Sequence, residues 1–324
     1  MSVKVILVTG EGGDAQGWGN MHVTEEVCAS IKRNGHDCEI VCAETPEELE
    51  QGLAKAGRGL VWSALYFFSG KSEIIGNSDN AVWIADLLDS WGIPYIGPSA
   101  SVMKSLISKY DTHEILSKAG VSVPKHTLCP PSVASDIDYF PAFIKPNGES
   151  RSIGISDRSV AENMAQLTTQ IDYINKELGQ GALVEEYLPG REYTVLVIGN
   201  GRHQEILPGR VTVAEEHYGK YHILRSDLRG VGLTKVSIPK EHYDEAVALA
   251  DAACKSLGCK DHIRIDMREG ADSRLRIMEV NGIPGLKPVK SWSPQIFSLY
   301  HPGPDSYDRL IGTIIAAATE SLDT

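Results

Sequence analysis

Two apolar stretches near the C-terminus, 263–267 and 277–281, carry polar side chains at alternating positions. Every second side chain of a strand faces the same side, so pairing of these strands would gather on one face Arg264, Asp266, Glu279 and Asn281. Carboxylate and amide oxygens suit Mg²⁺ bound together with nucleotide phosphates. The alternative is a solvated sheet face with ordinary salt bridges, and the glycine-rich turn 282–285 directly afterwards argues against it.

A lysine and a loop of small residues form a second candidate site. Lys145 stands near the end of an apolar stretch and is followed by the loop 147–154, which contains Ser150. Backbone N–H groups of such a loop can approach a phosphate, and a nearby lysine supplies charge. The loop is not a Walker motif, and an ordinary Gly/Ser turn is the alternative.

The third candidate is the segment 183–195, in which a strand ends in Glu185 and Glu186, turns at Pro-Gly and restarts with Arg-Glu. Acidic acceptors are what an adenine amino group and ribose hydroxyls require. An ordinary hairpin with charged rims explains the same residues when this segment is taken alone.

Together these motifs resemble the ATP-grasp superfamily, and within it the D-alanine–D-alanine ligases, over nearly the whole chain. The passage 91–99 followed by 108–111 is similar to that family's G-I-P-Y-T-G and D-K motifs. The hairpin 186–195 is similar to its central hairpin, and 264–266 with 279–285 is similar to its metal-site signature. The resemblance implies an ATP-grasp fold with an N-terminal Rossmann-like domain.

The resemblance also implies roles for single residues toward ATP. Phosphates would be contacted by Lys109, Lys145 and Ser150, and by Lys220 on a loop after the hairpin. The base would lie against Glu185 and the backbone of Glu186, Tyr187 and Leu188, and the ribose against Glu192.

On the chemical side, the resemblance implies that Asp266, Glu279 and Asn281 hold two Mg²⁺ ions, which Mn²⁺ can replace. Arg264 and the backbone N–H of Gly285 would stabilise the oxyanion of a tetrahedral intermediate. A homodimer is a further expectation from the family.

The substrate half departs from the family pattern. The turn 12–20 lacks the family's serine and its glutamate, of which the glutamate binds the first substrate's ammonium group, and Asp14 is a candidate replacement. After Gly285 the family has a small hydroxyl residue, whereas this chain has Lys287 and Lys290. These lysines either clamp an extra carboxylate or are solvated, and the sequence leaves both interpretations open.

The elements that position these residues follow a mixed α/β pattern. Strand and helix alternate through the first third, which predicts a parallel sheet with its ligand crevice at the carboxyl ends of the strands. The segment 101–120 is predicted as one helix. We expect an N-terminal α/β domain at 1–100, a central lid subdomain at 101–182 and a C-terminal domain with the metal site at 183–324.

Composition narrows the remaining classes. A formal net charge of −12 argues against a nucleic-acid-binding surface, and the sequence contains no apolar run long enough for a membrane span. The six cysteines form no C-x-x-C pair, so reduced thiols and a cytoplasmic protein are expected.

The sequence therefore predicts an ATP-dependent ligase that joins two amino acids, or an amino acid and a small amine, through an acyl phosphate. Non-D-alanine substrates are favoured, and D-alanine–D-alanine ligation is the alternative within the class. A non-catalytic ATP-binding protein and an NAD-dependent dehydrogenase are weaker alternatives, the latter because the G-x-G-x-x-G spacing is missing.

Overall fold

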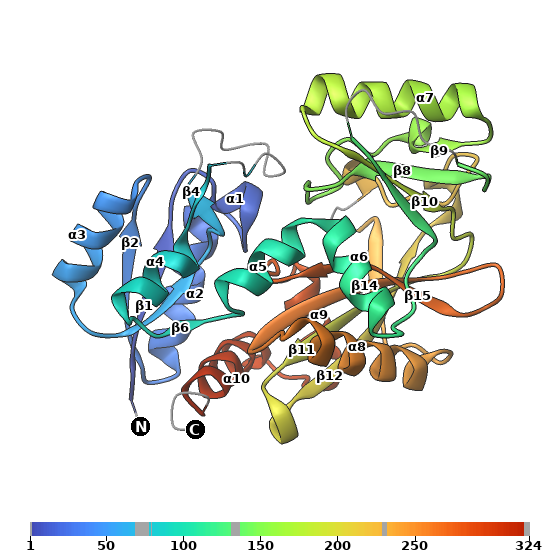
Figure 1. Ribbon diagram of the computed structural model, residues 1–324. Helices are drawn as coiled ribbons and strands as arrows, with labels where there is room; N and C mark the ends of the chain where they lie inside the picture. The colour runs from blue at the N-terminus through green and yellow to red at the C-terminus, as the bar shows by residue number, and fades with distance from the viewer. Residues whose placement is uncertain (1, 69–77, 79, 131–136, 229–231, 321–324) are drawn as a thin grey trace.

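The computed structural model describes residues 2–68, 78, 80–130, 137–228 and 232–320. The N-terminal part is a parallel sheet of order β2-β1-β3-β6 with helices around it (Figure 1). Its strands and helices are β1 Lys4–Thr9, α1 Gly13–Gln16, α2 Met21–Arg33, β2 Asp37–Cys42, α3 Pro46–Ala56, β3 Leu60–Ser63, β4 Phe67–Phe68, β5 Val82–Trp83, α4 Ile84–Trp91 and β6 Tyr95–Ile96. The predicted parallel α/β arrangement is confirmed.

The segment 101–120 forms two helices, α5 Ala100–Ile107 and α6 Lys109–Lys118, so the prediction of one helix was wrong. Ser108 breaks it: its backbone is extended (φ −82°, ψ 103°) and its side chain accepts from the Asp111 N–H. The Lys109 N–H donates to the Asn147 carbonyl at 3.1 Å, a contact 38 residues away that local periodicity does not reveal.

A second, antiparallel sheet of order β7-β10-β8-β9 is covered by α7 and lies at the upper right in Figure 1. Its elements are β7 His126–Cys129, β8 Ala142–Pro146, β9 Val160–Ala161, α7 Met164–Tyr173 and β10 Ala182–Glu186. The helix α7 starts at Met164 after the Asn163 cap and continues as a π-helical turn, Ile174–Leu178.

The largest sheet is antiparallel, of order β13-β12-β11-β14-β15. Its elements are β11 Glu192–Ile198, β12 Glu205–Val213, β13 Thr234–Ser237, α8 Tyr243–Leu257, β14 His262–Glu269, β15 Leu275–Asn281, α9 Trp292–Tyr300 and α10 Ser306–Glu320. The apolar side chains of β14 and β15 pack against α8, which leaves their alternate, polar side chains for the opposite face.

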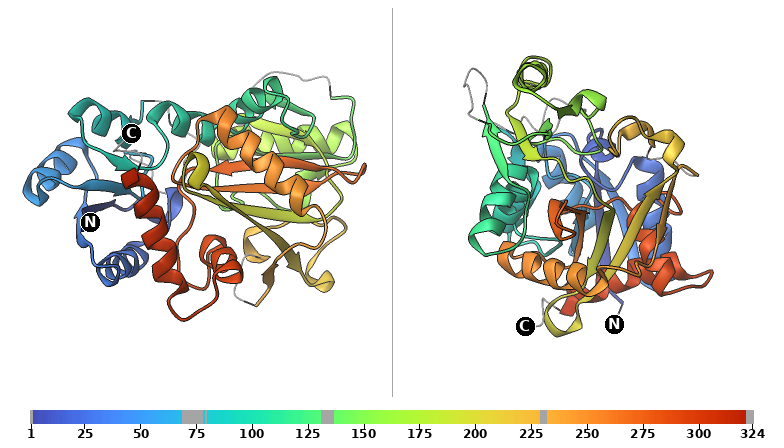
Figure 2. Two further views of the ribbon diagram at one scale, coloured as in Figure 1. Left: turned by 90° about the horizontal axis from the view of Figure 1, so that it is seen from below. Right: turned by 90° about the vertical axis from the view of Figure 1, so that its right-hand side faces the viewer.

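The C-terminal helix α10 returns to the N-terminal part and packs beside α2, as two views agree (Figure 2). Asp308 of α10 accepts from Arg33 at 2.7 and 2.8 Å and from Ser30 at 2.7 Å. The N-terminal helix α2 and the C-terminal helix α10 therefore stabilise one another through packing and an ion pair. The predicted domain limits at residues 100 and 182 stay a prediction.

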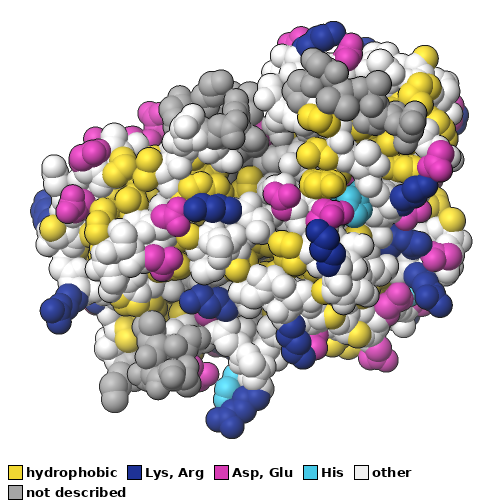
Figure 3. Space-filling view, viewed as in Figure 1, with side chains coloured by type: hydrophobic (Ala, Val, Ile, Leu, Met, Phe, Trp, Pro, Cys, Tyr) yellow, Lys and Arg dark blue, Asp and Glu magenta, His cyan; other side chains and the backbone are white. Residues whose placement is uncertain are grey.

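Acidic and basic side chains lie interspersed on the face seen in Figure 3, so the net charge of −12 does not gather there in one patch. None of the helices within the described ranges has the length and apolar composition that crossing a bilayer requires.

Candidate active site

The two strands singled out by their alternating polar residues are neighbours in the largest sheet. In the register of β14 and β15, Asp266 stands opposite Glu279 and Arg264 opposite Asn281. The predicted pairing is confirmed, and it places all four polar residues on the face turned away from α8. A register shift directly after Asp266 interrupts the regular ladder beside these side chains, and pairing resumes at Met267.

Arg264 holds Asp266 with two parallel hydrogen bonds, Nε to Oδ1 at 3.0 Å and Nη2 to Oδ2 at 2.9 Å. Thr194 of β11 donates to the same carboxylate at 2.8 Å, and the Asn281 amide lies 3.4 Å away. The guanidinium also stacks over the Trp292 ring, 5.2 Å from its centroid. Several contacts within the protein thus fix the side chains of both Asp266 and Arg264 without a bound ligand.

These residues fit the chemistry of a magnesium site that shares its ions with phosphates. No cluster of three His, Cys, Asp or Glu side chains suited to a metal occurs within the described ranges. The donor set is instead two carboxylates and an amide, Asp266, Glu279 and Asn281, from paired positions of adjacent strands. Mg²⁺ commonly binds through one or two carboxylates and takes its remaining oxygens from phosphates and water.

Lys109, the first residue of α6, reaches the same face. Its ammonium lies 3.2 Å from the Glu279 carboxylate and donates to the Glu149 carbonyl. Only 7% of Lys109 is exposed, so a buried cation stands beside a candidate metal ligand. The break at Ser108 is what brings the start of α6, and with it Lys109, to this position.

Lys145 and Glu185 form a buried ion pair between the antiparallel strands β8 and β10. Lys145 Nζ lies 2.8 Å from Glu185 Oε1 and donates to the Met278 carbonyl at 3.1 Å. Burial raises the pKa of Glu185, and the charge of Lys145 opposes that rise. Lys145 therefore pairs with Glu185, the acid predicted to contact the adenine base. It also lines the same cavity as Ser150 of the loop predicted to bind phosphate.

The hairpin after β10 lines a cavity of about 90 Å³, called the hairpin cavity below. Glu185, Tyr187, Leu188 and Glu192 border it, together with apolar side chains that suit the faces of a purine ring: Phe143, Ile153, Ile155, Ile223, Leu224 and Met278. Glu186 also borders the cavity, and its carboxylate pairs with Arg276 at 3.0 Å.

Arg268 belongs to this cavity and was missed by the sequence analysis. It pairs with Glu192 at 3.7 Å, lies over the Tyr187 ring at 5.7 Å and donates to the His222 carbonyl. The signal was present, because Arg268 continues the two-residue period of Arg264 and Asp266 on β14.

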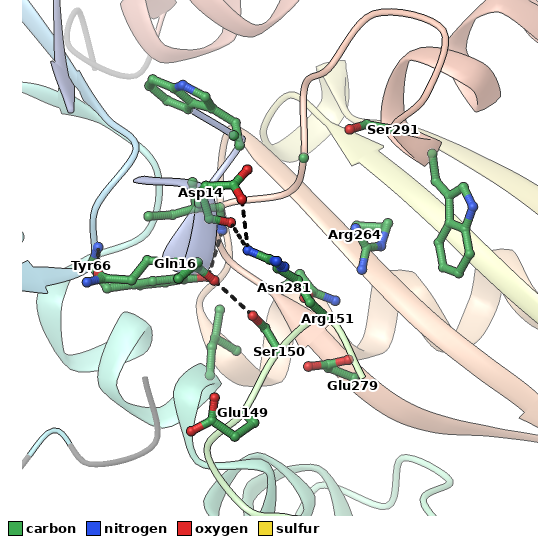
Figure 4. Close-up of a pocket in the computed structure, with 18 of the residues that line it drawn as sticks. Asp14, Gln16, Tyr66, Glu149, Ser150, Arg151, Arg264, Glu279, Asn281 and Ser291 are labelled. Carbon is green, nitrogen blue, oxygen red and sulfur yellow. Dashed lines mark hydrogen bonds and ion pairs between the residues drawn. The ribbon is translucent and has the colours of Figure 1, made fainter. Parts of the chain in front are cut away.

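A second cavity of about 340 Å³, called the polar cavity below, adjoins the hairpin cavity (Figure 4). Four residues line both cavities: Lys109, Glu149, Ser150 and Glu279. Gly285 borders the polar cavity, and a Cβ there would come within 2.7 Å of the Ser291 hydroxyl, so the turn needs glycine for its close approach.

The small-residue loop connects the polar cavity to the N-terminal part. Ser150 donates to the Ala15 carbonyl at 3.0 Å, and Arg151 donates to the Asp14 carbonyl at 2.7 Å and pairs with its carboxylate at 3.1 Å (Figure 4). Arg151 and Ser152 both have left-handed backbones, with φ of 56° and 60°. Such strain in consecutive non-glycine residues is held in place by surrounding contacts and clusters at ligand sites.

Lys287 and Lys290 also line the polar cavity, and within the described ranges neither forms an ion pair. Their loop is fixed from both sides: the Leu286 N–H donates to the Trp18 carbonyl at 3.2 Å, and the Tyr307 hydroxyl donates to the Leu286 carbonyl at 2.9 Å. Two unpaired cations are thus presented on an anchored turn.

Lys220 lies apart from both cavities. Its ammonium pairs with Glu162, which also accepts from the Tyr221 hydroxyl, and 70% of its side chain is exposed. The predicted contact with phosphates therefore requires the lysine to leave Glu162, and its role stays a prediction.

Comparison with known proteins agrees with this geometry. The family model "D-ala D-ala ligase C-terminus" matches residues 115–315. A D-alanine–D-alanine ligase of Desulforudis audaxviator is 28% identical over 275 residues, covering 81% of this chain and 83% of the relative. An uncharacterized protein of Sinorhizobium fredii, y4sG, is 26% identical and covers 94% of this chain and 89% of its own.

Solved structures share the fold. The D-alanine–D-alanine ligase of Bacillus anthracis complexed with ATP superposes with a TM-score of 0.74 at 20% identity, covering 99% of both chains. The VanG D-Ala:D-Ser ligase of Enterococcus faecalis gives a TM-score of 0.69 at 18% identity, covering 98% of this chain and all of the other.

The fold is therefore that of an ATP-grasp enzyme, an ATP-dependent ligase that forms carbon–nitrogen bonds. The chain belongs to the D-alanine–D-alanine ligase family, whose model matches more than half of it. The predicted fold, superfamily and enzyme class are confirmed.

Proposed function

We propose that this enzyme activates a carboxylate with ATP and joins it to an amine, with substrates other than a pair of D-alanines. The observation that carries the proposal is the junction of the two cavities at Lys109, Glu149, Ser150 and Glu279. A nucleotide in the hairpin cavity would present its terminal phosphate at this junction. An acid in the polar cavity would meet it there.

The hairpin cavity offers each part of ATP a partner. Glu185 accepts from the adenine amino group, the backbone of Glu186, Tyr187 and Leu188 borders the base, and Glu192 binds the ribose. Lys109, Lys145 and Ser150 contact the phosphates, joined by Lys220 when it leaves Glu162.

Asp266, Glu279 and Asn281 would hold two Mg²⁺ ions, and Mn²⁺ could take their place. When bound, the ions supply charge neutralisation for the phosphates. The protein's own contribution is to fix these ligands: Thr194 and Arg264 orient the Asp266 carboxylate, and Lys109 orients Glu279.

The reaction has two steps. A carboxylate oxygen of the first substrate attacks the γ-phosphorus, the bond from phosphorus to the β–γ bridging oxygen breaks, and ADP leaves with that electron pair. The amine of the second substrate then attacks the acyl carbon, loses a proton and expels phosphate. Arg264 and the Gly285 N–H face the carbonyl oxygen that becomes negative in this second step.

The substrates are inferred from charge. Five basic side chains line the polar cavity, Lys109, Arg151, Arg264, Lys287 and Lys290, against three acids, Asp14, Glu149 and Glu279. Asp14 is paired with Arg151, Glu279 is paired with Lys109, and the Glu149 carboxylate accepts from Gln180, so each of these three acids already has a partner within the described part of the chain. An acid substrate with a second carboxylate, as in a γ-glutamyl-type amide, suits Lys287 and Lys290 better than D-alanine does. Assembly as a homodimer is part of the same proposal.

The test is phosphate release from ATP and Mg²⁺ across a panel of single and paired amino acids, L and D, including glutamate and aspartate. Release that requires an acidic amino acid together with an amine supports the proposal. Release with D-alanine alone would return the enzyme to cell-wall-type ligation. ATP binding without release across a panel extended to dicarboxylic acids and amines would favour a non-catalytic nucleotide-binding protein.

A further inference from the structure

One tyrosine of the N-terminal part supports the turn that carries Gly285. Tyr66 lies between β3 and β4, borders the polar cavity and is only 7% exposed (Figure 4). Its hydroxyl oxygen accepts from two consecutive backbone N–H groups, that of Gly282 at 3.1 Å and that of Ile283 at 2.9 Å. A backbone N–H withdrawn from water needs an acceptor, and this one hydroxyl supplies it for both groups.

The other end of the turn is held by different groups. The Leu286 N–H donates to the Trp18 carbonyl at 3.2 Å, and the Leu286 carbonyl accepts from the Tyr307 hydroxyl at 2.9 Å. Between these two anchors stands Gly285, whose N–H has no acceptor among the described residues. The turn is thus fixed on both sides of an N–H group that remains available to a ligand in the polar cavity.

Tyr66 is itself held by the short helix α1. The Gln16 side chain accepts from the Tyr66 N–H at 2.9 Å and from the Phe67 N–H at 3.1 Å, and it donates to the Phe67 carbonyl at 3.1 Å. All three hydrogen bonds are buried, and the Tyr66 carbonyl also accepts from the Ile84 N–H at 3.0 Å. A fixed backbone at Tyr66 therefore holds its hydroxyl at a defined place beside the turn.

We propose that Tyr66 is a positioning residue for the second chemical step, the attack of the amine on the acyl phosphate. In that step the π electron pair of the carbonyl moves onto its oxygen, and the Gly285 N–H stabilises the charge only at hydrogen-bond distance. Tyr66 acts through Gly282 and Ile283, which precede Gly285 in the same turn. Misplacement of a catalytic group by about 1 Å can cost about 100-fold in rate. The inference rests on the proposed function, since it requires Gly285 to face the acyl oxygen.

The test separates the two chemical steps. Tyr66→Phe keeps the ring and removes only the hydroxyl that accepts from the turn. The acid is the one with the fastest phosphate release in the panel above, beginning with L-glutamate. Without an amine, migration of a heavy-oxygen label from the β–γ bridge of ATP to a non-bridging β position reports reversible formation of the acyl phosphate. Hydroxylamine then serves as the amine probe: its nitrogen attacks the acyl carbon, phosphate leaves, and the hydroxamate is measured.

We expect Y66F to slow hydroxamate formation about 10- to 100-fold, while label migration and ATP affinity change by less than about threefold. Exchange of the Gly282 and Ile283 amide hydrogens, followed by NMR, should accelerate at least about tenfold because both lose their acceptor. Tyr300→Phe is the matched control. Its hydroxyl donates to the Pro208 carbonyl at 2.7 Å, neither residue lines a cavity of the site, and Y300F should leave all these quantities unchanged.

Equal slowing of label migration and hydroxamate formation in Y66F would show a merely structural tyrosine and overturn the inference. Unchanged hydroxamate formation, or unchanged exchange of the two amides, would also overturn it. If Y66F does not fold, Gln16→Met, which releases Tyr66 from α1, replaces it, and an unchanged ratio of the two rates in Q16M has the same meaning. Absence of both phosphate release and label migration in the unmodified chain with every acid would defeat the proposed function itself, which separates the two failures.

Discussion

Arg264 grips Asp266 through two hydrogen bonds of 2.9 and 3.0 Å, although these residues are only two positions apart on one strand. The same arginine borders the polar cavity, whereas Asp266 borders the hairpin cavity. This ion pair therefore links the hairpin cavity, proposed for the nucleotide, to the polar cavity, proposed for the acid substrate.

Replacement of Arg264 should separate binding from turnover. Arg264→Ala removes the charge that faces the developing oxyanion, so kcat should fall about 100- to 1,000-fold. The affinity for ATP should change by less than about threefold, because Arg264 does not line the hairpin cavity. Phosphate release gives the first quantity and calorimetry the second. Arg202→Ala, an exposed arginine outside both cavities, is the control, and unaltered turnover in R264A would contradict the assignment.

Asp266 should matter mainly through magnesium. Asp266→Asn removes a negative ligand, so the Mg²⁺ concentration for half-maximal phosphate release should rise about 100-fold. Thr194→Val deletes only one of the hydrogen bonds that orient the carboxylate, the one of 2.8 Å, and should give a smaller rise of about tenfold. A D266N enzyme with normal magnesium dependence would exclude Asp266 as a ligand.

Lys220 and Glu162 offer a test of how the outer lysine reaches its target. If Lys220 must leave Glu162 before it meets phosphates, Glu162→Gln should raise kcat/KM for ATP by about twofold, since an exposed ion pair is easily broken. Lys220→Ala should lower the same quantity about 100-fold. The exposed pair Lys176–Asp172 supplies a control, D172N, which should have no effect. A drop in activity in E162Q would show instead that the pair is part of the active arrangement.

Lys287 and Lys290 should control the acid substrate alone. The double replacement K287M/K290M should raise KM for a dicarboxylic amino acid at least about tenfold while KM for ATP stays constant. Restoration of affinity for the same amino acid with its second carboxylate amidated would identify the group that they bind. Unchanged KM in the double variant would indicate solvated lysines, the alternative that the sequence left open.

The contact between α2 and α10 should give a pH-dependent stability. Arg33 and Ser30 lower the pKa of Asp308, so this stabilisation is present above the ordinary value of 3.8 and is lost as the pH falls through the folded-state pKa. Arg33 is half exposed, which limits the contribution to about 1 kcal/mol. Asp308→Asn should thus lower Tm by about 2 °C at pH 7 and by less near pH 3. A gap that does not narrow in acid would refute the linkage.

The alternation of β14 and β15 was readable from sequence because it depends only on the two-residue period, and the pairing followed from their shared pattern. The break at Ser108 was not, since the acceptor of the Lys109 N–H is Asn147, in the loop that follows β8. The helix α3 was overlooked although its Thr45 cap and Pro46 are typical start signals.

The ion pairs across the site also could not be predicted from local sequence patterns. Lys220 and Glu162 are 58 residues apart, and Asp14 and Arg151 are 137 apart. Motif matching located the candidate ligands on the sheet, where neighbours are fixed by register. It did not locate the partners of long side chains on loops. These partners depend on how the three main sheets and their connecting loops pack together.

The shared boundary of the two cavities has a consequence for how the substrate specificity of this enzyme can change, in evolution or by mutagenesis. The nucleotide side is built from paired strands, whereas the side proposed for the acid substrate takes Asp14 from the short helix α1 and Lys287 and Lys290 from a turn. Exposed positions outside the strand ladders tolerate replacement far better than strand positions do. A library confined to positions 14, 287 and 290 should therefore retarget which acid is activated while the phosphoryl donor and its machinery are inherited intact.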